Sequence, residues 1–197
     1  MSATRLGEAR HARGGQVYLR PLTEDDFTER YVSWFRDPKV TRFLDARSIT
    51  RQDAIDHLRQ GGNGKLWRLY AICEAAGDRH IGNLKIGAIH WRYMISDMVT
   101  VIGERDAWRK GHAREAIRLG IDIAFGDLNI RKLSASIDSL NVGSVKAYTA
   151  AGFHVETALK DQFMDLSGGE PVLSDKVYVA CFNPKFEPAR LPAGLHR

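Results

Sequence analysis

The chain has 197 residues, of which 44% are hydrophobic and 27% are charged. This length and these proportions suit one soluble, well-cored domain. Its apolar runs are shorter than the roughly 20 residues that a membrane-spanning helix needs, and residues 1–16 lack the apolar stretch of a secretory signal. We therefore expect a cytoplasmic protein without a membrane partner.

Cysteine content and charge narrow the function classes further. Cys73 and Cys181 each lie in a strand-like apolar run, so we expect buried reduced thiols and predict no metal site. Lys and Arg number 29 against 24 Asp and Glu, and the net charge of +5 permits an anionic ligand or a nucleic acid. We interpret residues 1–15 as a basic N-terminal arm, 16–183 as a single domain and 184–197 as a tail.

The first half of the chain predicts two helices and four strands. Thr23 and Thr50 are typical N-cap residues, and acidic residues follow each of them. Asp37-Pro38 is expected to end the first helix, because proline is not tolerated in a helix interior. The expected elements are a strand at 17–19, helices at 23–35 and 50–60, and strands at 66–73, 80–89 and 98–102, with a hairpin turn at Gly77-Asp78.

The second half contains the strongest helix pattern. From Ala113 to Leu128 apolar residues recur at spacings of three and four. Asn141 is a typical N-cap, and Gly152 suits a left-handed helix end. The expected elements are helices at 111–128 and 141–151 and strands at 133–137, 155–160 and 176–182, with a turn at 167–169. This order predicts an α/β (α+β) fold with a mostly antiparallel central sheet flanked by helices.

The stretch WRKGHAREAI, residues 108–117, predicts an anion site. A strand leads through a short loop to Gly111, where a helix begins, so the first backbone amides of that helix have no helical partner. Gly111 lets the backbone approach a phosphate, the helix dipole favours negative charge, and Arg109, Lys110 and Arg114 add cationic donors. The alternative is an ordinary loop glycine beside three solvated cations.

A second motif favours the anion site. With Asn141-x-x-Ser144-x-x-x-Tyr148-x-x-x-Gly152-Phe153, the chain resembles the GNAT superfamily of acetyl-CoA-dependent N-acetyltransferases over most of residues 17–182. In that family a Q/R-x-x-G-x-G/A loop holds the coenzyme A pyrophosphate. The matching residues are Trp108, Arg109, Lys110, Gly111, His112 and Ala113, with Trp108 in place of the usual Gln or Arg. The segments VYLRPLTEDD, WFRDPKVTRFL, IGNLKIG and NVGSVKAYTAAGF are similar to the branch of ribosomal-protein alanine and amino-sugar acetyltransferases.

The resemblance implies a site for acetyl-CoA as the acetyl donor. The strand that holds Val101, Ile102 and Gly103 is expected to splay from the strand at 133–137, so that its free backbone groups hold the pantetheine arm and polarise the thioester carbonyl. Asn141 and Ser144 are implied coenzyme contacts, although Asn141 is also explained as a helix cap.

Tyr148 is the candidate general acid. It lies where the family often carries a tyrosine near the coenzyme A sulfur, and a phenol with an ordinary pKa near 10 suits protonation of a thiolate. The alternative is that Tyr148 only packs its helix against the sheet.

Several residues are candidates for the general base. Asp97 precedes the pantetheine strand at a position where similar enzymes often carry Glu. His90, at the end of the preceding strand, has an ordinary pKa near neutrality. Glu104 and Asp138 are further candidates, and a weakly basic acceptor amine needs no dedicated base.

The identity of the acceptor is the part of the function that the sequence constrains least. Trp34 and Trp91 are predicted to line its pocket, although aromatics at such spacings are more often core residues. The branch implies either a nucleotide-linked amino sugar, which we favour because IGNLKIGAIHW is similar to amino-sugar acetyltransferases, or the N-terminal amine of a protein. An alternative of a different functional class is a non-catalytic module that binds nucleic acid or another polyanion. That alternative does not explain the Asn-Ser-Tyr-Gly-Phe spacing. The last two strands could also form a homodimer.

Overall fold

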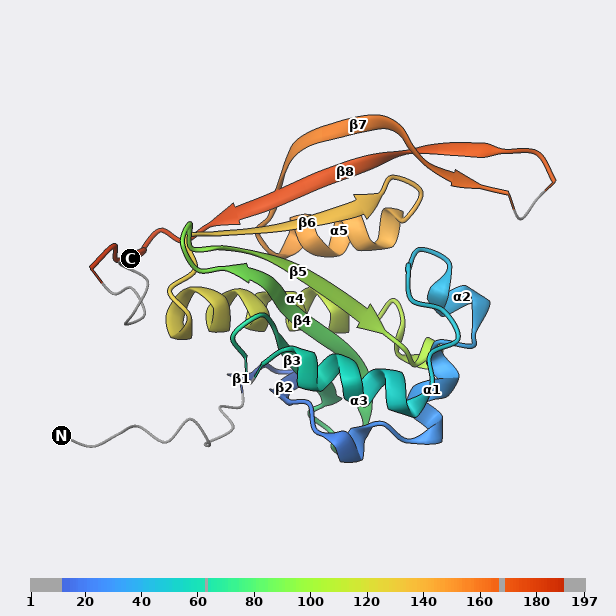
Figure 1. The fold of residues 1–197 in the computed structure, drawn as a ribbon, viewed down its shortest axis with the longest axis horizontal. Coiled ribbons are helices and arrows are strands. Elements are labelled where there is room, and N and C mark those ends of the chain that lie inside the picture. The colour runs from blue at the N-terminus through green and yellow to red at the C-terminus, as the bar shows by residue number, and fades with distance from the viewer. Residues whose placement is uncertain (1–11, 63, 167–168, 190–197) are drawn as a thin grey trace.

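The computed structural model of the chain describes residues 12–62, 64–166 and 169–189. One eight-stranded sheet runs through it in the order β1-β2-β3-β4-β5-β6-β8-β7, with helices on both faces (Figure 1). The strands are β1 (Ala12–Arg13), β2 (Val17–Pro21), β3 (Arg68–Glu74), β4 (His80–His90), β5 (Ile95–Ile102), β6 (Lys132–Asp138), β7 (His154–Asp165) and β8 (Val172–Phe182). The helices are η1 (Glu24–Asp26), α1 (Glu29–Trp34), α2 (Pro38–Thr41), α3 (Arg51–Gln60), η2 (Arg105–Ala107), α4 (His112–Asp122), η3 (Ile123–Asp127) and α5 (Val142–Ala151).

The sheet is antiparallel except at β5 and β6. These two strands run parallel and pair at only three positions, from Ile95 with Lys132 to Asp97 with Ser134. Beyond Asp97 they no longer pair with each other, and Figure 1 shows β5 and β6 diverging. The predicted splay and the mostly antiparallel sheet are therefore both confirmed.

Two hydrophobic cores lie on opposite faces of the sheet. Along β3, Tyr70 and Ile72 join the core that α4 and α5 cover, whereas Ala71 and Cys73 join the core that α1 and α3 cover. This division follows from the alternation of side chains along a strand. Cys73 and Cys181 are free and buried, as predicted. In the part of the chain that the structure describes, no helix is both long and apolar enough to cross a bilayer.

The predicted helix at 23–35 is divided into two in the structure. Thr23 is the N-cap of η1, and Thr28 is the N-cap of α1, where its hydroxyl accepts a hydrogen bond from the third helical amide at 3.3 Å. The dipeptide Asp37-Pro38 starts α2, with Asp37 as its N-cap. Proline is accepted there because the first residue of a helix needs no amide donor.

Three other predicted boundaries are wrong. β5 begins at Ile95 and not at residue 98, directly after Met94, which has a left-handed φ of 51°. α4 ends at Asp122 and continues as the π-helical turn η3. β7 and β8 form a longer hairpin than predicted, and residues 167 and 168 of the predicted turn lie outside the described residues.

The N-terminal segment is partly fixed to the domain. Residues 1–11 of the predicted arm lie outside the described residues, as do residues 190–197 of the predicted tail. Ala12 and Arg13 belong to the sheet, because they pair with β2 as β1. After β1, three successive amides from Gly15 to Val17 donate to the carboxylate of Glu115 on α4, at 2.5, 2.9 and 3.2 Å. This end of the predicted arm therefore holds α4 in place.

Candidate active site

The loop between β5 and α4 presents backbone amides at a helix start. Gly111 is the N-cap of α4 and has a φ of 87°, a left-handed conformation that favours glycine. Trp108, at the first position of the loop motif, donates its indole Nε1–H to the Ile102 carbonyl at 2.8 Å. Trp108 therefore anchors the loop to the end of β5.

A cavity of about 600 Å³, here called the loop cavity, opens beside this loop. The loop, β5 and α5 each contribute to its wall. Eleven of the residues predicted for the coenzyme line it: Val101, Ile102, Trp108, Arg109, Gly111, His112, Ala113, Arg114, Asn141, Ser144 and Tyr148. Of the predicted set, Lys110 and Gly103 are not in its wall.

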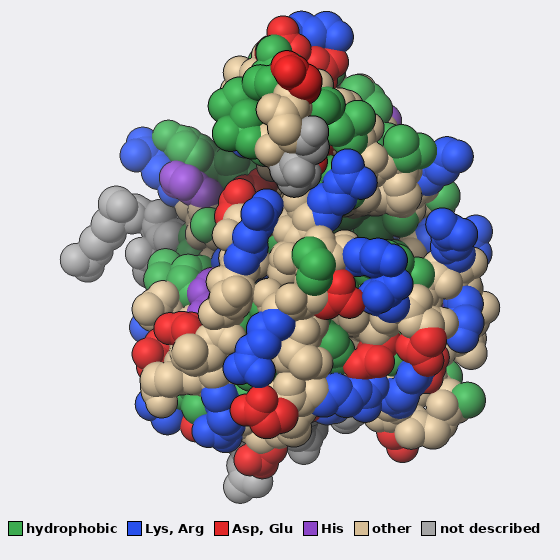
Figure 2. Space-filling model, turned by 90° about the vertical axis from the view of Figure 1, so that its right-hand side faces the viewer, with side chains coloured by type: hydrophobic (Ala, Val, Ile, Leu, Met, Phe, Trp, Pro, Cys, Tyr) green, Lys and Arg blue, Asp and Glu red, His purple; other side chains and the backbone are tan. Residues whose placement is uncertain are grey.

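A second cavity of about 940 Å³, here called the splay cavity, occupies the space between the diverging strands. Its wall comprises Met98–Thr100 of β5, Ala135–Asp138 of β6, Phe163–Leu166 at the end of β7 and part of the segment after α2. Figure 2 shows this end of the molecule, with the β7–β8 hairpin standing above the body and Lys and Arg side chains below it. Residues common to both cavities are Phe43, Leu44, Thr100, Asn141, Ser144 and Tyr148.

Tyr148 lies where the two cavities meet. Its ring is buried and packs edge-on against Phe153, with centroids 5.0 Å apart. Its hydroxyl donates to the Met98 carbonyl at 2.9 Å and lies 3.4 Å from Thr100 Oγ1. Burial raises the pKa of Tyr148 above the ordinary value of 10, so the phenol keeps its proton. A protonated donor is therefore present beside the strand that borders both cavities.

Of the predicted base residues, Asp138 lines the splay cavity, whereas Asp97 and His90 lie at different places. Asp97 immediately precedes Met98, which lines the splay cavity, and its Oδ1 accepts a hydrogen bond from Ser134 Oγ at 2.8 Å. His90 is the last residue of β4 and stacks on Tyr93, with ring centroids 4.5 Å apart. Neither side chain lines a cavity, but Asp97 lies at the point where the strands part.

The aromatic residues predicted for the acceptor lie outside both cavities. Trp34 is buried, and its Nε1–H donates to Glu104 Oε1 at 2.7 Å. A Cβ at Gly103 would lie 2.1 Å from the Trp34 ring, so this glycine is explained by packing. Trp91 donates its Nε1–H to the Lys65 carbonyl at 2.6 Å. Both tryptophans therefore make hydrogen bonds within the fold and line neither cavity, and their contact with the acceptor stays a prediction.

The structure brings other residues to the splay cavity that sequence reasoning did not single out. They are Arg42, Thr100, Ser136, Phe163 and Lys176. The sequence contained a signal for Ser136, because Ser134 and Ser136 alternate with apolar residues and mark the polar face of β6. Among the described residues, no group of three or more His, Cys, Asp or Glu side chains is arranged to hold a metal ion.

His112 adds a polar atom beneath the loop. Its side chain is buried in the wall of the loop cavity. Its Nδ1 has no hydrogen-bond partner within the described ranges. Buried polar atoms in native proteins nearly always have such a partner, so a bound group or water is the expected complement here.

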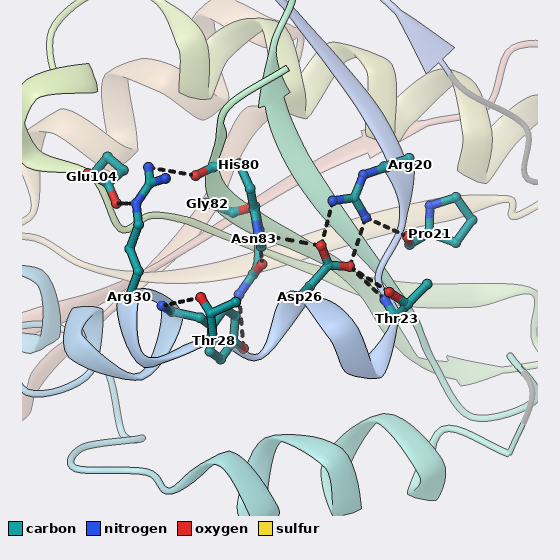
Figure 3. Close-up of polar contacts among 11 residues, drawn as sticks. Arg20, Pro21, Thr23, Asp26, Thr28, Arg30, His80, Gly82, Asn83 and Glu104 are labelled. Atoms are coloured by element: carbon teal, nitrogen blue, oxygen red, sulfur yellow. Dashed lines mark hydrogen bonds and ion pairs between the residues drawn. The ribbon is translucent and has the colours of Figure 1, made fainter. Parts of the chain in front are cut away.

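A polar network supports the elements behind this site (Figure 3). Arg20 of β2 donates to both carboxylate oxygens of Asp26, at 2.7 and 2.5 Å. Burial alone raises the pKa of Asp26, but hydrogen bonds from Arg20 and Thr23 outweigh burial and hold this pKa below its ordinary value of 3.8. The charged form of Asp26 is thus favoured in the folded state.

The network continues toward the end of β5. His80 Nδ1 lies 3.9 Å from the carboxylate of Asp26, and His80 Nε2 contacts Asn83 Oδ1 at 3.0 Å. Arg30 of α1 donates to the His80 carbonyl at 3.1 Å and to Glu104 Oε1 at 2.7 Å (Figure 3). These residues line neither cavity, so we assign the network to fixing α1 against β4 and β5.

Comparisons with known proteins agree with this geometry. The model of the acetyltransferase (GNAT) domain matches residues 16–154. A probable N-acetyltransferase, YjcK of Bacillus subtilis, is 27% identical over 189 residues, which cover 89% of this chain and 98% of that protein. The crystal structure of spermidine N-acetyltransferase from Vibrio cholerae, in complex with CoA and spermine, matches with a TM-score of 0.76 at 18% identity and covers 88% of this chain and 99% of that one.

A third similar protein belongs to another acceptor class. The ribosomal-protein-S5-alanine acetyltransferase of Vibrio fischeri matches with a TM-score of 0.73 at 17% identity, over 91% of this chain and 100% of that one. The family match spans most of the chain, and the chain therefore belongs to the GNAT acetyltransferase family. It is an N-acetyltransferase, as the names of its relatives agree, and the non-catalytic alternative is set aside.

Proposed function

We propose that the protein transfers an acetyl group from acetyl-CoA to a primary amine by direct attack in a ternary complex. The observation that carries this proposal is that the loop cavity and the splay cavity meet at Tyr148, beside the unpaired edge of β5. The coenzyme would occupy the loop cavity and the amine the splay cavity.

The residues of the loop cavity suit a coenzyme with a diphosphate. The amides at the start of α4 would receive the diphosphate, with Arg109 and Arg114 as cationic neighbours. The buried Nδ1 of His112 supplies a further polar atom in the same wall. Beyond Asp97, β5 no longer pairs with β6, so backbone groups on this edge of the strand would bind the amides of an extended arm, although the Ile102 carbonyl already accepts the Trp108 indole N–H.

Acetyl-CoA supplies the acetyl group as a thioester. The amine nitrogen forms a bond to the carbonyl carbon, the carbon–sulfur bond breaks, and the thiolate takes up a proton. Tyr148 would donate that proton, because it lines both cavities and carries its hydroxyl where they meet. Asp97 would accept the ammonium proton, directly or through water, because it lies at the point of divergence. His90 pairs with Ile95, the first residue of β5, and its ring stacks on Tyr93, so it is the weaker candidate.

For the acceptor we propose an amino sugar linked to a nucleotide, with a protein N-terminus as the alternative. The polar wall of the splay cavity, which includes Ser136 and Lys176, supports a hydroxyl-rich or charged acceptor. The Vibrio cholerae neighbour was solved with spermine and the Vibrio fischeri neighbour is named for a protein acceptor, so the fold accommodates several amines. We also propose a homodimer through β7, whose outer edge is unpaired within the described sheet.

Calorimetric titration of acetyl-CoA into three proteins tests the coenzyme site. Gly111→Glu places a carboxylate and a strained residue in the loop. Gly77→Glu is the matched control, because Gly77 has a φ of 86°, lies in the β3–β4 turn and lines neither cavity. We expect micromolar binding by the wild type and by Gly77→Glu, and its loss in Gly111→Glu. Equal binding by all three would contradict a diphosphate site at this loop.

A further inference from the structure

Two cations of the splay cavity have no ion-pair partner among the described residues: Arg47, which is exposed, and Lys176. Lys176 of β8 is partly buried, and its Nζ lies 5.3 Å from the ring centroid of Tyr178 and 6.0 Å from that of Phe163. Across the described part of the chain, no carboxylate lies within ion-pair distance of it. An ammonium has three N–H donors, and aromatic faces satisfy them only weakly.

The nearby carboxylates already have other contacts. Asp138 is the direct cross-strand partner of Lys176, but its Oδ1 accepts the Leu140 amide at 2.8 Å. Asp165 lies 3.9 Å from Arg42. Neither of these carboxylates lies within ion-pair distance of Lys176, so its ammonium is available to a ligand.

The position of Lys176 sets where that ligand group lies. β6 separates β8 from β5, and neighbouring strands lie about 4.8 Å apart, so the ammonium is on the order of 10 Å or more from the reacting carbonyl at the edge of β5. Ser136, paired with Tyr178 on the same face, adds a hydroxyl between the two points.

We propose that Lys176 determines acceptor specificity by binding an anionic group, a phosphate or a carboxylate, at a distance from the amine that is acetylated. This inference rests on the proposed function and narrows its acceptor to amines that also carry an anion. A polyamine is disfavoured, because it would place a second cation next to Lys176.

Pairs of acceptors, one member with an anion and one without, test this specificity. UDP-glucosamine is compared with glucosamine, and the peptide Ala-Ala-Glu amide with Ala-Ala-Gln amide, with spermidine as the polycation. For at least one pair we expect kcat/KM to be about tenfold higher for the anionic member, and this advantage to shrink as salt rises. The two pairs distinguish a phosphate of a nucleotide sugar from a carboxylate of a peptide.

Variants assign the preference to Lys176. Lys176→Gln should reduce the ratio within the pair to about one, chiefly by lowering kcat/KM for the anionic member, and Lys176→Arg should restore part of it. Lys65→Gln removes the same charge from an exposed residue outside both cavities and should keep the full ratio. Acetyl-CoA binding measured on each variant shows that the coenzyme site is intact.

Three results would overturn the inference. They are equal rates within both pairs, a preference that survives in Lys176→Gln, or spermidine as the best acceptor. If acetyl-CoA binds but no amine of the panel is acetylated, the inference also fails, while the coenzyme site stands. If acetyl-CoA does not bind, the proposed function itself fails.

Discussion

Removing the hydroxyl of Tyr148 is the sharpest test of the proposed chemistry. Tyr148→Phe keeps the buried ring and its edge-on contact with Phe153, and it deletes one hydrogen bond of 2.9 Å to the Met98 carbonyl. A single buried hydrogen bond contributes about 1 kcal/mol to folding, so we expect the free energy of unfolding to fall by about that amount. For a domain of this size the melting temperature should fall by roughly 2–4 °C.

The expected effect on catalysis is much larger than the effect on stability. A general acid contributes about 10²- to 10⁴-fold, so kcat should fall at least a hundredfold while the KM for acetyl-CoA changes little. The assay follows release of the CoA thiol at saturating acetyl-CoA with an excess of the acceptor. Because burial raises the pKa of Tyr148 above 10, ionisation of this phenol should not limit the rate up to about pH 9.

Tyr70→Phe is the matched control for this prediction. Tyr70 is also buried, burial also raises its pKa, and it lines neither cavity. It should lose a similar amount of stability and keep the wild-type kcat. If Tyr148→Phe retains a kcat within threefold of the wild type, Tyr148 only packs α5 against the sheet, and its assignment as the acid is wrong.

Three further substitutions test other parts of the argument. Asp97→Asn keeps an oxygen for the hydrogen bond from Ser134 but removes the proton acceptor. We expect kcat/KM for the acceptor to fall at least tenfold at pH 7 and to recover at higher pH, where the amine is already deprotonated. An unchanged kcat/KM would show that Asp97 is not the base. Asp26→Asn should lower the free energy of unfolding by about 2 kcal/mol near pH 7 in urea titrations. The pKa of Asp26 is lower in the folded state than its ordinary 3.8, so the wild type should lose this stability as the pH falls below 3.8. If the free energy of unfolding of Asp26→Asn falls with pH just as that of the wild type does, the assignment is wrong. Glu115→Gln weakens three hydrogen bonds from backbone amides and should lower the free energy of unfolding by about 1–2 kcal/mol. Amide hydrogen exchange in residues 15–17 should become faster. Unchanged exchange would show that the carboxylate does not hold this turn.

Local signals predicted most elements of this fold. The helix after Gly111, the cap at Asn141 and the left-handed end at Gly152 depend on the residue itself and its nearest neighbours, and the structure reproduces them. The helix at 23–35 was less predictable. Thr23 and Thr28 are both good caps, and only the packing of α1 against the sheet decides which of them begins the longer helix.

The wall of the loop cavity was easier to predict than the wall of the splay cavity. The loop residues are contiguous, so one motif places them together. The splay cavity draws on segments more than 100 residues apart, such as Arg42 and Phe163, and the sequence carries no local sign of that contact. The surroundings of Trp34 could not be predicted for a similar reason, because its partners Gly103 and Glu104 are recognised only once α1 is packed against the end of β5.

The three-pair junction of β5 and β6 also bears on how the protein holds together without its ligands. The sheet has two unpaired strand edges in its interior, where a neighbouring molecule cannot reach them as it could reach an outer strand. The junction, the packing of α4 against α5 and the hydrogen bond from Tyr148 to the Met98 carbonyl join the two halves. A ligand that spans the gap binds the folded state alone, so at a hundred times its dissociation constant it would add about 2.7 kcal/mol to stability. The concentration of coenzyme would then set the lifetime of the protein as well as its rate of turnover.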